Sequence, residues 1–408
     1  MAITHLIVDN GNYSVTVHNK VVKNLYDVVK ALYAVVPNHT AEDCYIRGTI
    51  SVVNAHPSYV EYLEENFPDL HITMTGEAYI ENDDKLTQSK LGVLGDGVGL
   101  TVSAAAAITS VYSAFSGYSN LVDGSFFQYF TGLANATASN STASTFYNCT
   151  RLAQVILPQG LKTIGARMFE GCGSLTSISI PNSVTSIASG DRTYNGYTYQ
   201  YEGPFVGCTN LTSVVIGTGL TQIGSYAFVN CSSLTSVHIS DLAAWSSITC
   251  YQQGNPLYYA HHLYLGEEEI VNLVIPNGVT SIGRGAFYGG SAFTSLSIPD
   301  SVTTIGQEAF RDCSSLTSVT IPDSVTSIEN YAFYGCRNLT TISIGNSVTR
   351  IGSQCFRGNN YLSSVTVRIE TPLSIDSYTF ENRANATLYV PYGCSAAYRA
   401  ANYWKEFN

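Results

Sequence analysis

The sequence has few charged residues. Only 12% of its 408 residues are Asp, Glu, Lys or Arg, which is roughly half the usual share. Ser, Thr, Asn, Gly and Tyr must therefore supply most of the polar surface. Acidic residues outnumber basic ones, and the net charge is -11 without any run of Lys or Arg. This balance argues against nucleic acid or an anionic membrane surface as a partner.

Motifs that usually mark catalysis or cofactor binding are also missing. The chain has no C-x-x-C pair, and the glycine-rich stretch at 95–99 lacks the lysine of a phosphate-binding loop. No nucleophile-elbow motif surrounds any of the many serines. His261 and His262 form a pair without a Cys or carboxylate motif at metal spacing, and Glu267 to Glu269 are typical of a solvated loop. We therefore predict no catalytic residue, no metal, no cofactor and no enzymatic activity.

Export and membrane-spanning segments are not visible either. The N-terminus lacks a basic start, and Asp9 and Asn10 interrupt its apolar stretch, so it does not read as a signal peptide. The most apolar window, from Leu100 to Phe115, is too short and too rich in Ser and Thr to cross a bilayer. We expect no transmembrane segment and no insertion into a membrane.

What the chain does contain is a repeat of 23 residues. The repeat is marked by Phe, and by a Pro or Gly after a short apolar run. Two units, 175–210 and 234–269, are longer at 36 residues, and two weaker units lie upstream of residue 152. The Phe positions are Phe146, Phe169, Phe205, Phe228, Phe287, Phe310, Phe333 and Phe356. The Pro positions are Pro158, Pro181, Pro276, Pro299 and Pro322, with Gly217 and Gly345 at the same place.

One unit cannot bury its apolar side alone. In LTSVxIP the apolar residues point inward along a short strand, and Pro ends the ladder. SVTSI supplies a second extended segment, and AFxGC turns back with Phe in the interior. Stacked units bury these sides against each other, which predicts a solenoid with a parallel sheet along one side.

The unit LTSVxIPxSVTSIGxxAFxGC resembles the BspA-like (Treponema pallidum-type) leucine-rich repeats over about three quarters of the chain. The predicted fold is an α/β-type solenoid, mainly β, preceded by a small α+β domain. We expect the α+β domain at 1–94, the solenoid at 95–384 and a C-terminal cap at 385–408. In the cap, Tyr398, Ala401, Trp404 and Phe407 are placed to cover the last coil from a short helix. The resemblance implies surface display, adhesion and binding of protein or glycan, and it does not imply catalysis.

Residues 1–94 lack the repeat. Apolar residues at helical spacing predict a helix over 21–36 and another after Pro57. YIRGTISV and LHITM are typical of strands. This module caps the first coil, anchors the chain to other assembly proteins, or forms homo-oligomers, and these roles are compatible.

Most of the ten cysteines recur at one repeat position. Cys149, Cys172, Cys208, Cys231, Cys313 and Cys336 occupy it, whereas Gly290 and Asn359 take the same place in other units. This favours buried thiols that act as small apolar fillers. Disulfides between neighbouring coils, or a metal, are the alternatives, although the spacing between coils is long for the Cβ atoms of a disulfide.

Tyrosine is the feature that suggests binding. The sequence has 29 Tyr, and several crowd with Gly and Asn in the two long units, a composition typical of antibody binding loops. The candidate binding residues are Tyr194, Tyr197, Tyr199, Tyr201, Trp245, Tyr251, Tyr258 and Tyr259. The alternative is that these loops pack on their own coils.

The exposed face of the predicted sheet is a second candidate surface, because its side chains are small and nearly uncharged. The column is expected to run through Ile156, Ser179, Val215, His238, Val274, Ser297, Thr320, Ser343 and Thr366.

The function that we expect is non-enzymatic recognition or adhesion through binding of a protein or glycan on a host surface. The expected setting is a phage virion, as a tail or head-decoration protein, since no export signal is visible. The alternatives are a bacterial cell-surface adhesin and a purely structural assembly protein. In either setting the chain would face the extracellular side.

Overall fold

The computed structural model describes residues 105–135, 141–189 and 202–408 with their side chains. Elsewhere it describes only the backbone of strands β1 to β8, β14 and β15. The chain divides into two compact units, residues 1–108 with 129–132 and residues 109–128 with 133–408. The helices predicted at 21–36 and after Pro57 lie outside the described residues, apart from Val21, which belongs to β4.

The first unit contains a four-stranded sheet in the order β3-β2-β5-β6. β2 pairs antiparallel with β3 and β5, whereas β5 and β6 run parallel. YIRGTISV lies in β5, and LHITM lies in β6. β1 pairs with β4 and β7 with β8, both antiparallel. The strands are β1 (Ala2–Ile3), β2 (Leu6–Asp9), β3 (Ser14–Val17), β4 (Lys20–Val21), β5 (Tyr45–Val53), β6 (Leu70–Thr75), β7 (Tyr79–Ile80) and β8 (Leu100–Thr101).

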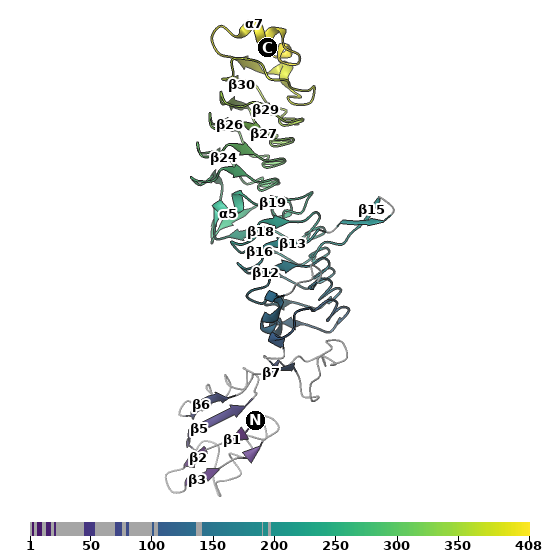
Figure 1. Ribbon diagram of the computed structural model, residues 1–408, viewed down its shortest axis with the longest axis vertical. Helices are drawn as coiled ribbons and strands as arrows, with labels where there is room; N and C mark the ends of the chain where they lie inside the picture. The colour runs from purple at the N-terminus through teal and green to yellow at the C-terminus, as the bar shows by residue number, and fades with distance from the viewer. Residues whose placement is uncertain are drawn as a thin grey trace. The chain divides into compact units, whose positions relative to one another are not determined.

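The second unit winds into stacked coils, and most coils add one strand to a parallel sheet along one side (Figure 1). Within these strands buried Ile, Val or Leu alternates with exposed Ser or Thr, as one buried sheet face requires. The predicted mainly β solenoid is thus confirmed. The strands of this side are β9 (Asp123–Gly124), β10 (Gln154–Val155), β12 (Ser177–Ile180), β16 (Ser213–Ile216), β18 (Ser236–Ile239), β20 (Leu263–Leu265), β21 (Glu268–Glu269), β22 (Asn272–Val274), β24 (Ser295–Ser297), β26 (Ser318–Ile321), β28 (Thr341–Ile344), β30 (Ser364–Val367) and β31 (Thr387–Tyr389).

A second column of two-residue strands comes from the SVTSI segments, and it also pairs in parallel from coil to coil. Its strands are β11 (Thr163–Ile164), β13 (Ser186–Ile187), β17 (Gln222–Ile223), β19 (Thr249–Cys250), β23 (Ser281–Ile282), β25 (Thr304–Ile305), β27 (Ser327–Ile328) and β29 (Arg350–Ile351).

Hydrogen bonds from exposed threonines join successive coils on the outside of the solenoid. The Thr212 hydroxyl donates to the Thr176 carbonyl at 3.0 Å, and the Thr235 hydroxyl to the Thr212 carbonyl at 3.3 Å.

The interior of the turns is a stack of Phe rings. Consecutive rings from Phe115 to Phe228, and again from Phe287 to Phe380, lie nearly parallel with centroids 4.7 to 5.5 Å apart. All these Phe side chains are buried. Because each ring contacts the ring above and the ring below, the stack joins successive coils into one core.

The predicted long unit at 234–269 departs from the regular coil twice. A short helix, α5 (Leu242–Ser246), follows β18, and an antiparallel hairpin joins β20 to β21. Leu257, which is fully buried, stands where the Phe stack is interrupted. Asn255 secures this coil, because its Nδ2 donates to the carbonyls of Gly285 and Ala286 at 2.7 and 2.9 Å.

The other long unit carries an antiparallel hairpin of β14 (Asp191–Tyr194) and β15 (Tyr197–Tyr201), which projects from the coils in Figure 1. The remaining helical elements are short. They are η1 (Ser125–Tyr129), η2 (Thr131–Asn135), α6 (Leu257–Ala260), η3 (Arg383–Asn385), α7 (Ser395–Ala400) and η4 (Trp404–Glu406).

The C-terminal segment lies against the last Phe. The rings of Trp404 and Phe407 lie 5.7 and 5.4 Å from that of Phe380. The indole of Trp404 donates to the Leu373 carbonyl, and the Tyr398 hydroxyl to the Ile369 carbonyl, both at 2.8 Å. The end of the stack is therefore covered rather than left open to water. None of the helices described in this structure has the length and apolar character that crossing a membrane requires.

Candidate functional site

From Phe115 to Phe356, each coil that carries a Phe turns sharply around it, and the residue two positions later has positive φ. This residue is Gly, Asn or Asp, the types that adopt the left-handed conformation most readily. Gly335 has φ of 71°, Asn148 of 56° and Asp312 of 58°. We call the residues from two before to four after each Phe, or after Leu257, the turn edge.

The residue two positions before Phe is also left-handed, although it is often large. Arg167, Tyr226, Glu308 and Tyr331 occupy this position with φ of 58 to 60°. Such a backbone costs about 1–3 kcal/mol for a bulky residue. A hydrogen bond to the next coil helps to hold it, as where the Tyr331 N–H donates to the Ser353 carbonyl at 3.1 Å. Large polar side chains are thereby fixed at the turn edge.

Tyr and Arg contact each other along the turn edge. The Arg311 guanidinium lies 5.1, 5.9 and 4.9 Å from the ring centres of Tyr288, Tyr331 and Tyr334. Its Nη1 also donates to Oε1 of Glu308 at 3.0 Å. Burial acts to lower the pKa of Arg311, but Tyr288 and Glu308 outweigh it, so the pKa is raised. The cation is thus shared by side chains from three coils.

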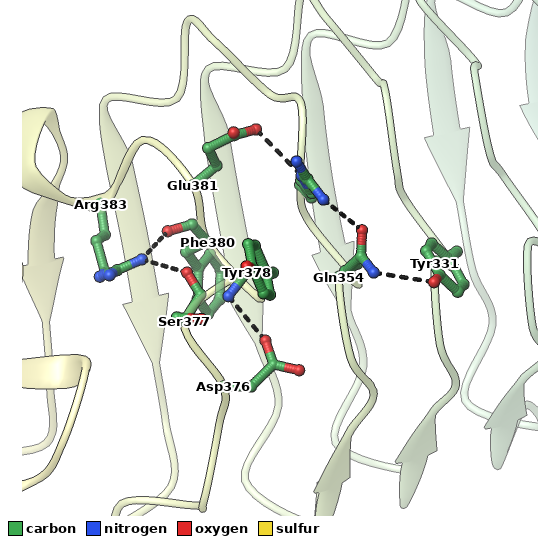
Figure 2. Close-up of polar contacts among 9 residues, drawn as sticks. Tyr331, Gln354, Asp376, Ser377, Tyr378, Phe380, Glu381 and Arg383 are labelled. Carbon is green, nitrogen blue, oxygen red and sulfur yellow. Dashed lines mark hydrogen bonds and ion pairs between the residues drawn. The ribbon is translucent and has the colours of Figure 1, made fainter.

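The same pattern continues toward the C-terminus, as Figure 2 shows. Gln354 Nε2 donates to the Tyr331 hydroxyl at 2.9 Å, and Arg357 Nη1 donates to Oε1 of Gln354 at 2.8 Å. Arg357 also lies 3.6 Å from Glu381 and 4.9 Å from the Tyr378 ring centre. We call this chain of contacts the Tyr–Arg stripe. Its members are Tyr288, Arg311, Tyr331, Tyr334, Arg357 and Tyr378.

A groove of about 610 Å³ is lined by the residues of the turn edge that follow the Phe position. Cys231 and Ser232 line one end together with Tyr258, Tyr259 and His261 of the next coil, and Arg337 lines the other end. Asp312 lies between them. Burial raises the pKa of the Asp312 carboxyl, against the lowering effect of Arg311 and Arg337.

The structure treats the predicted binding residues differently. It brings Tyr258 and Tyr259 together in the groove, with ring centroids 4.9 Å apart and planes at 89°. Tyr251 is half-buried beneath the Arg284 guanidinium, 5.1 Å away. Trp245 is 2% exposed, so its ring is not at the surface.

The four tyrosines of the first long unit lie in the β14–β15 hairpin. Tyr194 and Tyr197 are opposite each other in the strand register, and Tyr199 and Tyr201 follow in β15. Their side chains lie outside the described residues, so their part in binding stays a prediction.

The predicted column on the sheet face is exposed or half-exposed along its length. Its apolar members stand out, because Val274 is 58% exposed, Ile156 45% and Val215 42%. His238 stacks on Tyr264 with centroids 4.7 Å apart. The face carries small groups and no arginine in that column, so it offers fewer specific contacts than the turn edge.

The cysteines at the repeat position are buried and unpaired. Each thiol donates to the carbonyl of a Phe in the preceding coil, as from Cys172 to Phe146 at 3.1 Å and from Cys313 to Phe287 at 3.2 Å. Burial raises the pKa of Cys149 and of Cys231 to about 12, so these thiols stay protonated. The prediction of buried filler thiols is confirmed for this set, while Cys44 lies outside the described residues.

The described ranges contain several His, Cys, Asp and Glu side chains. No group of three His, Cys, Asp or Glu among them could hold a metal ion. His262 pairs with Glu269, whose Oε1 lies 2.6 Å from Nδ1, and this contact is solvent-exposed. The arrangement at the turn edge is suited to contact with a ligand through rings, guanidinium groups and hydroxyls.

Reasoning from the sequence missed the Tyr–Arg stripe. The interior pattern was read from the constant letters of AFxGC, but the stripe occupies the variable letters that flank them. Reading those positions down the alignment of units would have revealed Tyr288, Arg311, Tyr334 and Arg357 in one column.

Comparison with known proteins supports the repeat assignment. A family model described as "BspA type Leucine rich repeat region", with six copies, matches residues 124–254 and 261–390. A search of curated proteins finds no significant match.

Several solved leucine-rich repeat structures are similar to the chain. One from T. pallidum is 27% identical, covering 52% of this chain and 76% of its own, with a TM-score of 0.27. One from Bacteroides ovatus is 21% identical, covering 61% and 86%, with a TM-score of 0.24. A leucine rich cell surface protein from Faecalibacterium prausnitzii is 22% identical, covering 60% and 82%, with a TM-score of 0.29.

Proposed function

The chain belongs to the BspA-type leucine-rich repeat family, and on that premise we propose that it is a non-enzymatic recognition or adhesion protein. Its ligand is a protein or glycan on a cell surface. The proposal agrees with the family's repeat architecture, in which stacked units present extended binding surfaces.

The observation that carries this proposal is the Tyr–Arg stripe. Tyr and Arg are the residue types that concentrate binding energy at interfaces. Here the phenol rings and guanidinium groups lie on a backbone tied to its neighbours by hydrogen bonds in every coil. A ligand that binds such a preorganised surface loses little entropy from ordering side chains.

The setting of this recognition stays a prediction. We place the protein on a phage virion, with a bacterial cell surface as the alternative, and we assign attachment to residues 1–94. Antibody labelling of purified virions and of intact cells, followed by electron microscopy, separates the two settings. Label on cells without label on particles would overturn the virion assignment.

A purely architectural role is the second candidate, because two runs of stacked Phe rings join successive coils and could stiffen an assembly. The two functions differ in what the surface must do. An architectural protein tolerates changes in exposed side chains, whereas a recognition protein loses binding when its contact residues are removed.

The test is binding of the labelled full-length chain to intact bacterial cells and to arrays of glycans and surface proteins. The double variant Arg311→Ala with Tyr334→Ala should weaken binding by about tenfold or more. The matched control, Ser297→Ala with Thr320→Ala, changes two exposed residues of the sheet face and should bind normally. Equal binding by both variants would remove the Tyr–Arg stripe from the proposal.

The β14–β15 hairpin is tested in the same assay. Tyr197→Ala with Tyr199→Ala should reduce binding if the hairpin contributes to the same surface. Unchanged binding would exclude these tyrosines as contact residues and would leave the Tyr–Arg stripe as the site.

A further inference from the structure

The groove of the turn edge runs along the stack rather than across it. Its lining residues lie one to four positions after the Phe position and come from five successive coils, from Cys231 at one end to Arg337 at the other. The Phe rings of adjacent coils are 5.1 and 5.4 Å apart in this region. Four intervals of about 5 Å each make the groove about 20 Å long. Such a groove suits an extended chain whose units repeat at about the spacing of the coils.

The backbone along the groove is already hydrogen-bonded. The N–H groups of Gly289, Asp312 and Gly335 donate to carbonyls of the next coil at 2.9, 2.7 and 2.8 Å. A peptide that adds to a sheet edge needs free backbone groups on its host. These three amides are not free, so recognition in this groove depends on side chains.

The side chains that face the groove are suited to hydroxyl groups. Ser232, Ser291 and Ser314 each lie four positions after a Phe, in three regular coils that contribute to the groove. Their hydroxyls make no hydrogen bond among the described residues. Asp312 supplies a carboxylate that accepts hydrogen bonds, and Arg337 supplies a guanidinium that donates them. A ligand rich in hydroxyls can satisfy all of these groups.

Glycine brings the groove floor close to its neighbours. A Cβ atom placed on Gly289 would lie 2.5 Å from the Cα of Tyr258, and one on Gly335 would lie 2.2 Å from Oδ1 of Asp312. Both glycines have positive φ, of 83° and 71°. Neither position can carry a side chain without displacing Tyr258 or Asp312, so the groove stays open at these two glycines.

The aromatic end presents a fixed ring corner. Tyr258 packs on Tyr288 at 4.7 Å and stands perpendicular to Tyr259, whose hydroxyl donates to the Gln253 carbonyl at 3.3 Å. His261 Nδ1 lies 3.0 Å from the Gly289 carbonyl oxygen. Rigid tyrosine rings offer broad apolar contact with little loss of entropy, which suits the apolar face of a sugar ring.

The charged side chains that line the groove limit the class of ligand that it can bind. One carboxylate, that of Asp312, and one guanidinium, that of Arg337, line the groove. Asp312 is also paired with Arg311, whose Nε lies 3.6 Å from Oδ2 of Asp312. A phosphate-rich or polyanionic chain would need several cations at this site. The balance of charge therefore favours a neutral ligand.

From these observations we propose that the groove binds a neutral, extended oligosaccharide, with one sugar ring against Tyr258 and Tyr259 and later units along Asp312 toward Arg337. This proposal rests on the recognition function above and assigns its ligand class and site. The Tyr–Arg stripe then lies beside the glycan rather than beneath it.

The test titrates the full-length chain with neutral oligosaccharides of increasing length, including β-linked glucose and N-acetylglucosamine oligomers, by isothermal calorimetry. Affinity should rise with each added unit up to about four, one for each interval between coils, and then level off. Tyr259→Ala and Asp312→Asn should each weaken binding of the longest ligand by about tenfold. Ser291→Phe fills the groove without removing these groups and should abolish binding, whereas Ser343→Phe on the sheet face should not.

Failure of this proposal is distinguishable from failure of the recognition function. If the chain binds cells, but neutral oligosaccharides do not compete and Tyr259→Ala and Ser291→Phe bind cells normally, the glycan groove is wrong and recognition stands. Competition by an extended peptide or by an anionic polysaccharide alone would also overturn the neutral glycan. If the chain binds neither cells nor any array, both proposals fail.

Discussion

The coil around Phe310 and the coil around Leu257 do the same structural work with different residues. Both side chains are fully buried. In the regular coil a Phe ring stacks on its neighbours and Cys313 fills the position beside it. In the irregular coil Leu257 and Ala260 replace them, and Asn255 adds buried hydrogen bonds to the next coil.

The difference between these coils teaches how the fold tolerates change. The interior requires an apolar side chain of roughly suitable volume, and a loss of ring stacking is offset by other contacts. Outside, the irregular coil gains Tyr258 and Tyr259, which line the groove. In this coil, a change in the scaffold and a gain of aromatic rings at the surface therefore occur together.

The largest effect is expected from truncating the regular interior. Phe310→Ala should lower the free energy of unfolding by about 3–5 kcal/mol, because it leaves a cavity between Phe287 and Phe333. Leu257→Ala should cost less, at about 2–4 kcal/mol, since its stack is already interrupted. Guanidinium denaturation of both variants, with exposed Ser318→Ala as the control, measures the contrast. A larger loss at Leu257 would show that the irregular coil is the more tightly packed one.

A second substitution places Cys at the one repeat position described here where a buried Asn, Asn359, stands in its place. Asn359 takes the Cys position, is 2% exposed, and has both side-chain polar atoms buried without a hydrogen-bond partner among the described residues. Asn359→Cys should raise the free energy of unfolding by about 1–3 kcal/mol, because it removes this unpaired amide. Asn360→Ser, at the next position, serves as the control. A destabilised Asn359→Cys protein would indicate that the amide has a partner such as bound water.

The third change tests the thiols by pH. The pKa of Cys149 is about 12 in the folded chain, against about 8.5 for an unfolded thiol. Because the pKa of Cys149 is higher in the folded chain, the contribution of this thiol to the free energy of unfolding is fully present below pH 8.5. It is lost as the pH rises toward 12. Between pH 7 and pH 10, ionisation of this single thiol in the unfolded chain should lower the free energy of unfolding by about 2 kcal/mol. The Cys149→Ser variant lacks the thiol and should not show this part of the decrease.

Denaturation curves of both proteins at the two pH values give this difference, which cancels the titration of all other groups. Parallel losses in the wild type and in Cys149→Ser would mean that the thiol ionises as easily when folded as when unfolded.

The smallest effect is expected at the surface. Arg311→Ala should lower the free energy of unfolding by about 1 kcal/mol, through loss of the contacts with Tyr288 and Tyr334. Arg337→Ala, which removes an exposed guanidinium, should change stability little. Thermal unfolding of the two variants measures this difference in stability. An equal effect of both substitutions would mean that the contacts of Arg311 in the Tyr–Arg stripe do not stabilise the fold.

Much of the solenoid could be predicted from its sequence because its coils repeat. The 23-residue spacing of Phe, Pro and Cys located the interior, the strand ends and the filler positions, since each must recur where coils stack. The exposed column from Ile156 to Thr366 followed from alternation along the strands. These features depend on a local pattern, which the chain states many times.

The candidate site was less predictable because it depends on contacts between coils. Arg311 meets Tyr288 and Tyr334, each 23 residues away, and no single unit contains that contact. Trp245 illustrates the opposite error, since an aromatic residue in an insertion reads as a surface group until α5 is seen to bury it. The interruption at Leu257 gave no signal, because Phe was the marker and Phe is absent there.

The threonine bonds between coils have a consequence for inheritance. Several seams between coils are closed by a Thr hydroxyl that donates to the backbone carbonyl of a Thr one coil away, as from Thr212 to Thr176 and from Thr235 to Thr212. A gene that duplicates or deletes one whole unit recreates an equivalent seam at the junction. Descendants of such a gene would differ in the length of the groove by one coil at a time, so the size of the ligand becomes a trait that recombination can set in steps.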